Sequence, residues 1–122
     1  MPTKKLPHDH GTPTQKLLEQ QPDQNVFDRA SDTFQLISDS TRLKILWLLC
    51  HSEECVINIA AAIDMSSPAV SHHLRILKQT GLLTSRRVGK EIYYTLSAAK
   101  EADLVHKVID QIFDMHCERR AT

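Results

Sequence analysis

The hydrophobic spacing of this chain changes near Gly81, and that change restricts the fold more than any other feature. Across residues 26–77 apolar side chains recur every three or four positions, the spacing of amphipathic helices. Across residues 83–96 the period is two, as in strands, and residues 88–91 fit the tip of a hairpin. Helical spacing returns over residues 104–113. The sequence therefore predicts a mainly α fold with one β-hairpin.

The residues between the apolar segments predict where each helix begins and ends. Residues 39–40, Asp-Ser, can cap a helix whose residues 43–49 are apolar almost all round, so that helix should be buried. Residues 64–66 form a short polar turn between a third and a fourth helix, with Ser66 as the cap of the fourth. We expect Ser97 to cap a last helix that runs to about Cys117. Two helices joined by a short turn and followed by a hairpin make a winged helix-turn-helix.

Composition divides the chain into an arm, one domain and a tail. Residues 1–24 hold four of the five prolines and few apolar side chains, so we expect a mobile arm with one weak turn at residues 15–20. Residues 25–118 are expected to form the DNA-binding and dimerisation domain, and residues 119–122 a tail.

The N-terminus lacks a signal peptide, no run of about 20 apolar residues exists, and three cysteines suggest a reducing compartment. We therefore expect a cytoplasmic protein without a membrane partner.

An enzyme is not expected from this sequence. It has 3 glycines in 122 residues, with no glycine-rich phosphate loop and no nucleophile elbow. His72 and His73 could look like a catalytic pair, but neighbours on a helix point about 100° apart and do not converge on one substrate.

The net charge of zero hides a basic segment at residues 66–90, which carries five Lys or Arg and no Asp or Glu. A basic second helix followed by a basic hairpin is the pattern expected for binding DNA phosphates. Hydroxyl, imidazole and guanidinium groups on the helix can read base edges, while cations at its end and on the hairpin position the protein on phosphates. A solvated helix face is the alternative, but charge, helix pair and hairpin coincide here. The expected DNA contacts are Ser66, Ser67, Ser71, His72, Arg75, Lys78, Arg86, Arg87 and Lys90.

The last helix has an apolar face wider than one neighbour needs. Leu104, Val108 and Ile112 form one stripe, and Val105, Ile109 and Phe113 form a second beside it. The surplus predicts that this helix also packs against a second subunit.

Four segments, in this order, carry a resemblance to a known family. They are Asp39-Ser40-Thr41-Arg42-Leu43-Lys44-Ile45-Leu46, Glu54-Cys55-Val56, Ser66-Ser67-Pro68-Ala69-Val70-Ser71-His72-His73-Leu74 and Gly89-Lys90-Glu91-Ile92-Tyr93-Tyr94. Across residues 26–117 the chain resembles the ArsR/SmtB family of dimeric bacterial repressors, which leave DNA when a metal ion or oxidant binds. The resemblance implies that Ser71 and His72 face the major groove of operator DNA. It also implies a homodimer built mainly from the first and last helices of the domain.

One family metal site lies at the start of the third helix and is completed by the N-terminal arm. Cys55 matches it, Ile57 cannot ligate, and Asn58 replaces a carboxylate. The arm offers His8, Asp9 and His10. Cys and His are zinc ligands, so a zinc site is one interpretation, and a buried structural thiol is the other.

The family's second metal site lies on the last helix, and its usual ligand positions carry Ala98, Lys100, Gln111 and Asp114 here, so that site is absent in its usual form. A displaced site is one interpretation, in which Asp103 and His106 of one chain meet Asp114, His116 or Cys117 of the other. A solvated acidic helix edge is the alternative. The metal candidates, for zinc or another divalent ion, are therefore Cys55, Asp103, His106, His116 and Cys117.

A redox response is the runner-up. Some relatives sense persulfides through two cysteines, at positions that align with Trp47 and Phe113. Cys50 and Cys117 lie about one helical turn beyond them. A disulfide between them would need Cα atoms within about 7 Å, and a core role for Cys50 is the alternative. A regulator without an inducer, or an interaction protein that does not bind DNA, also remains open.

Overall fold

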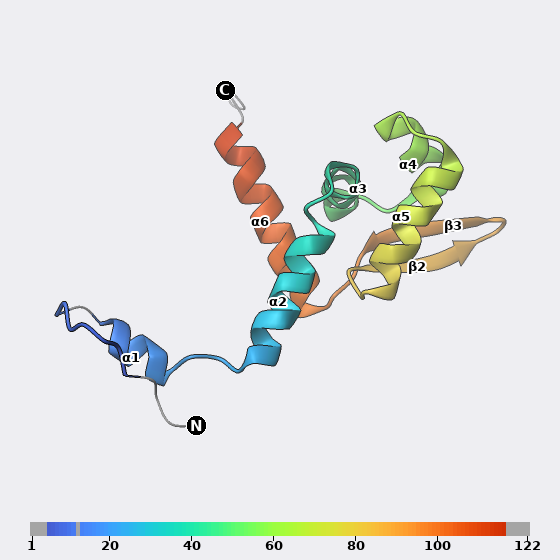
Figure 1. Ribbon diagram of the computed structural model, residues 1–122. Helices are drawn as coiled ribbons and strands as arrows, with labels where there is room; N and C mark the ends of the chain where they lie inside the picture. Colours follow the sequence, from blue (N-terminus) through green and yellow to red (C-terminus); the bar gives the residue numbers. More distant parts are fainter. Residues whose placement is uncertain (1–4, 12, 117–122) are drawn as a thin grey trace. The chain divides into compact units, whose positions relative to one another are not determined.

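The computed structural model describes residues 5–11 and 13–116 (Figure 1). Contacts divide the chain into two units, Met1–Thr33 and Phe34–Thr122. The elements, in chain order, are α1 (Thr14–Glu19), α2 (Gln24–Leu36), α3 (Ser40–His51), β1 (Glu54–Cys55), α4 (Val56–Ile63), α5 (Ser67–Gln79), β2 (Leu83–Val88), β3 (Glu91–Leu96) and α6 (Lys100–His116). The expected winged helix-turn-helix is thus present from α3 onward. The division into arm, domain and tail stays a prediction.

Helix α3 begins where the sequence predicts. An Asp39 carboxylate oxygen accepts a hydrogen bond from the backbone N–H of Arg42 at 3.0 Å, and this bond lowers the pKa of Asp39. Ile45, Leu46 and Leu49 are buried, but the side of α3 that carries Trp47 is not, since Trp47 is 46% exposed. The expectation that α3 is buried was therefore wrong for the side of the helix that carries Trp47, whereas the face with Ile45, Leu46 and Leu49 belongs to the core.

The turn of the helix-turn-helix is set by Asp64, which ends α4 in the left-handed conformation at φ 56°. The N–H of Met65 bonds back to the carbonyl of Ala60 at 3.0 Å, which satisfies the end of α4. Ser66 then caps α5, its hydroxyl accepting from the N–H of Ala69 at 3.3 Å. The predicted turn at residues 64–66 is confirmed.

The wing is a three-stranded antiparallel sheet in the order β1-β3-β2. β2 and β3 form the predicted hairpin, with Gly89 at φ 62° in its tip. The third strand was not predicted. β1 has only two residues, opposite Tyr93 and Tyr94 of β3, and two residues are too few to show a period.

The core lies between α3, α4, α5, the wing and α6. Its largest fully buried side chains are Ile45, Leu46, Leu49, Ile59, Val70, Leu74, Leu77, Leu82 and Ile109. Ser97 does not cap α6, which begins three residues later at Lys100. Instead, the Ser97 hydroxyl donates to the carbonyl of Gly81 at 2.6 Å and accepts from the N–H of Ala99, so it ties the end of the wing to the end of α5.

Helix α6 has both a buried and an exposed apolar stripe. Ala102, Val105 and Ile109 belong to the core. The exposed side chains, between 36% and 59% accessible, are Leu104, Val108, Ile112 and Phe113. The predicted surplus of apolar surface is therefore present within one subunit. None of the helices in the described part of the chain is long and apolar enough to cross a membrane.

Candidate nucleic-acid interface

Helix α5 separates its apolar residues from its polar ones. Val70, Leu74 and Leu77 are fully buried and fix the helix against the core. The spacing of 3.6 residues per turn then turns the polar residues of α5 outward. The exposed ones include His72, Arg75 and Lys78, while Ser67 and Ser71 are half-buried.

The two adjacent histidines of α5 lie in different environments. His72 is exposed, whereas His73 is half-buried and its Nδ1 is buried without a hydrogen-bond partner. His72 is therefore the one available to an external ligand. The Ser66 hydroxyl, also among the expected DNA contacts, is engaged in capping α5.

Arg86 on β2 is held by an acidic residue that sequence reasoning missed. Its Nε and a terminal nitrogen donate to the two carboxylate oxygens of Glu53, both at 2.7 Å. This side-chain hydrogen bond lowers the pKa of Glu53, and the Arg86 guanidinium also lies 5.9 Å from the ring centroid of Tyr93. Glu53 is 33 residues away in sequence, and the pairing of β1 with β3 brings it near the wing.

The remaining cations of the segment are not neutralised in this way. Within residues 5–11 and 13–116, Arg86 is the only one of the five basic residues at 66–90 that forms an ion pair. Arg87 donates from Nε to the carbonyl of Gly89 at 3.2 Å and keeps its charge exposed at the hairpin tip. The helix and the wing therefore present a surface of uncompensated positive charge, which attracts a polyanion.

Of the predicted metal residues that the structure describes in the second unit, only His106 belongs to a group of side chains that could share an ion. Cys55 is buried in β1, at 7% exposure. His8 and His10 belong to the first unit, where their rings stack at 5.7 Å. Asp103 forms an ion pair with Lys107 at 3.0 Å and is not among the residues grouped around His106. The His116 side chain and Cys117 lie outside what the structure describes.

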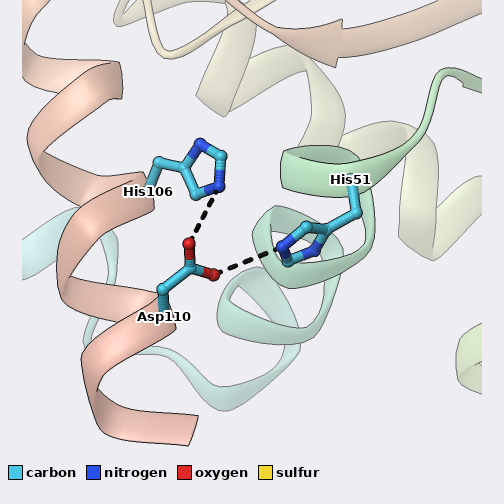
Figure 2. A group of neighbouring side chains, drawn as sticks. All are labelled: His51, His106 and Asp110. Carbon is cyan, nitrogen blue, oxygen red and sulfur yellow. Dashed lines mark ion pairs between the residues drawn. The ribbon is translucent and has the colours of Figure 1, made fainter. Parts of the chain in front are cut away.

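Three side chains that could share a metal ion do meet, at the contact between α3 and α6 (Figure 2). His106 and Asp110, one turn apart on α6, approach to 3.2 Å, and His51 at the end of α3 lies 3.2 Å from the other Asp110 oxygen. Sequence reasoning proposed His106 but missed His51, which looked like part of a polar break after α3. We call these three residues the His-His-Asp cluster.

The cysteine proposed for redox chemistry is not activated. Burial, and secondarily the charge of Asp110, raise the pKa of Cys50 to about 11, so the thiol is protonated at neutral pH and a poor nucleophile. Cys117 lies outside the described residues, so the disulfide is untested. The two positions that align with redox cysteines are held by Trp47 and Phe113, whose ring centroids lie 6.1 Å apart.

Comparisons with known proteins agree on the type of protein. Residues 39–85 match the family model described as bacterial regulatory protein, arsR family. The "Transcriptional repressor SmtB homolog" of Synechocystis sp. is 37% identical over 95 residues, which are 75% of this chain and 72% of that protein. The "Cadmium resistance transcriptional regulatory protein CadC homolog" of Staphylococcus aureus is 41% identical over 85 residues, 69% of each chain. A solution structure of a homodimeric winged helix-turn-helix DNA-binding domain from Mycobacterium bovis matches 84% of this chain and 96% of its own, with a TM-score of 0.65 and 28% identity.

Proposed function

This chain belongs to the ArsR/SmtB family of DNA-binding transcriptional repressors, and we propose that it leaves its operator when a divalent metal ion such as zinc binds. The family comprises transcriptional regulators rather than enzymes, as the sequence predicted. The proposal extends to the residues that hold the DNA, to the dimer and to the class of inducer.

The observation that carries the DNA-binding role is the two-sided character of α5 beside an exposed basic wing. Three fully buried residues fix α5, so its outer face is rigid. Ser71, His72 and Arg75 on that face have the donors and acceptors that base edges require. Lys78, Arg87 and Lys90 are exposed cations, which supports their proposed role as phosphate contacts.

A homodimer is proposed because α6 exposes a second apolar stripe and because the M. bovis domain is homodimeric. Pairing through α6 and the first helix of the domain, α2, would remove that stripe from water. A symmetric dimer would then place two α5 helices in successive major grooves about 34–36 Å apart and read a pseudo-palindromic site.

A metal inducer is proposed because the described residues include a set of nitrogen and oxygen donors suited to a divalent ion. The S. aureus relative, by its name, regulates cadmium resistance. The redox alternative is less favoured, since the Cys50 thiol is protonated at neutral pH. For metal to release the protein, it must bind the DNA-incompetent arrangement more tightly, by a coupling of about 1–3 kcal/mol.

The test begins by selecting binding sites from random-sequence DNA with reduced, chelator-treated protein. Fluorescence anisotropy of a selected labelled fragment is then measured with chelator and with excess zinc chloride. We expect tight binding with chelator and at least about 5-fold weaker binding with zinc, the lower end of usual couplings.

Two results would count against the proposal. Equal affinity for selected and scrambled fragments would contradict a sequence-reading repressor. Equal operator affinity with chelator and with zinc, cobalt, nickel or cadmium would contradict a metal inducer.

A further inference from the structure

We infer that His51, His106 and Asp110 form a metal-binding centre inside one subunit, for a zinc-class divalent ion, and that it is the inducer site. The second half of this inference rests on the proposed function, whereas the first half does not. The centre differs from the one expected on α6, because its third ligand comes from α3 of the same chain and it needs no residue from a partner.

The distances suit a small tetrahedral ion. Bonds of 2.0–2.1 Å from zinc to its ligands place neighbouring ligand atoms about 3.3 Å apart. Both histidine Nε2 atoms lie 3.2 Å from an Asp110 oxygen, and all three ligand atoms lie within 4.8 Å of one another. Figure 2 shows the two imidazoles pointing at the carboxylate from two helices, so only a small closure is needed.

The tautomer of His51 strengthens the case. Its Nδ1 lies 3.1 Å from the carbonyl oxygen of Trp47. A carbonyl only accepts hydrogen bonds, so Nδ1 must carry a proton, and the neutral ring then has its lone pair on Nε2. That atom lies 3.2 Å from an Asp110 carboxylate oxygen, so a metal ion between them could be bound by both. A backbone carbonyl on the far nitrogen is also the usual support of a metal-bound histidine.

The donor set defines the class of ion. Two imidazoles and a carboxylate suit zinc, cobalt or nickel, and the absence of a thiolate from the set disfavours soft ions such as arsenite or lead. Three protein ligands leave a fourth position for water, and the partial exposure of all three side chains, 52%, 35% and 53% in chain order, gives an ion access.

The same region connects the centre to the wing. His51 ends α3, and Glu53, two residues on, holds Arg86 of β2. The hydroxyl of Thr95 on β3 bonds to the carbonyls of Leu49 and Ser52 at 3.4 and 3.2 Å, which ties the end of α3 to the sheet. An ion that draws the end of α3 toward α6 therefore acts on the segment that positions the wing.

The test uses full-length, reduced protein and cobalt chloride, followed by zinc chloride in competition. Wild type should bind one ion per subunit, and its cobalt spectrum should lack a thiolate-to-cobalt charge-transfer band. His51→Ala and the isosteric Asp110→Asn should each weaken zinc binding by about 100-fold or more, since loss of even a supporting group costs about 10–100-fold. Glu101→Gln, in the first turn of α6 and also exposed, is the matched control and should bind like wild type.

Cobalt bound equally by wild type, His51→Ala and Asp110→Asn would overturn the centre, as would a charge-transfer band lost in Cys55→Ser. The DNA assay separates the two proposals. Zinc release of operator DNA that survives in His51→Ala and Asp110→Asn would overturn the inducer role of this centre and keep the proposed function. Metal binding that depends on these residues without any change in operator affinity would support the centre and overturn metal-controlled repression.

Discussion

The ion pair between Glu53 and Arg86 should limit how strongly this protein binds DNA, and Glu53→Gln should relieve that limit. Two charge-assisted hydrogen bonds of 2.7 Å hold the guanidinium against the carboxylate in the free protein. The amide of Gln keeps the shape of the side chain and removes its charge. Arg86 can then bind a phosphate oxygen without first breaking its ion pair with the carboxylate of Glu53.

The salt dependence of binding gives the magnitude. Each phosphate contact contributes about −0.9 to the slope of log K against log salt. If the four cations expected at phosphates, Lys78, Arg86, Arg87 and Lys90, make that contact in both subunits, the slope is about −7, and if Arg86 stays with Glu53 it is about −5. Glu53→Gln should therefore steepen the slope by up to about 2, which corresponds to a gain in affinity of at most about 60-fold at 0.1 M salt.

The assay is fluorescence anisotropy of operator and scrambled fragments over a series of salt concentrations. Glu54→Gln is the matched control, because it removes the same charge from the next residue, whose carboxylate accepts from Asn58 instead of Arg86. The gain should appear on both fragments, since phosphate contacts carry no sequence information. A slope and affinity equal to wild type, or an equal gain in Glu54→Gln, would refute the role of the ion pair.

Three further predictions concern α5, α3 and α6. Ser71→Ala and His72→Ala should each reduce the ratio of operator to scrambled affinity, because each lost base contact removes about 1–3 kcal/mol of discrimination. An equal loss of affinity for both fragments in anisotropy would contradict base reading. Asp39→Ala should lower the free energy of unfolding by about 1 kcal/mol in urea titrations at neutral pH. The N–H of Arg42 lowers the pKa of Asp39, so the difference in the free energy of unfolding between wild type and Asp39→Ala should have its full size above the ordinary carboxyl pKa. It should vanish as the pH falls through the lowered pKa of Asp39. A difference that does not depend on pH would exclude the cap. Leu104→Lys with Ile112→Lys should convert the dimer to a folded monomer in sedimentation velocity, and an unchanged dimer would place the interface elsewhere.

The helices and hairpin could be predicted because their signals are local. Ser66 and Asp39 cap helices through residues three positions away, and Gly81 and Gly89 adopt positive φ, at 89° and 62°, where the period changes and where the hairpin turns. Such signals act within one or two turns of chain, so a single sequence carries them.

The features missed by sequence reasoning depend on contacts between distant segments. β1 exists because Glu54 and Cys55 pair with β3, and a segment of two residues is too short for its sequence to predict such pairing. Glu53 meets Arg86 for the same reason. His51 joins His106 only because α3 packs against α6, whereas the sequence reveals only spacings within one helix, such as that of Asp103 and His106. Sequence reasoning therefore found His106 of the His-His-Asp cluster but not its companion on α3, His51.

The most direct test of metal-controlled repression is the zinc affinity of the protein measured twice, alone and bound to operator DNA. Linkage requires that zinc and DNA weaken each other by the same factor. We predict that zinc binds the DNA complex about 5–150-fold more weakly than the free dimer, matching the loss of operator affinity caused by zinc. Equal zinc affinity in the two states would contradict the account, because a metal that does not distinguish them cannot release the repressor.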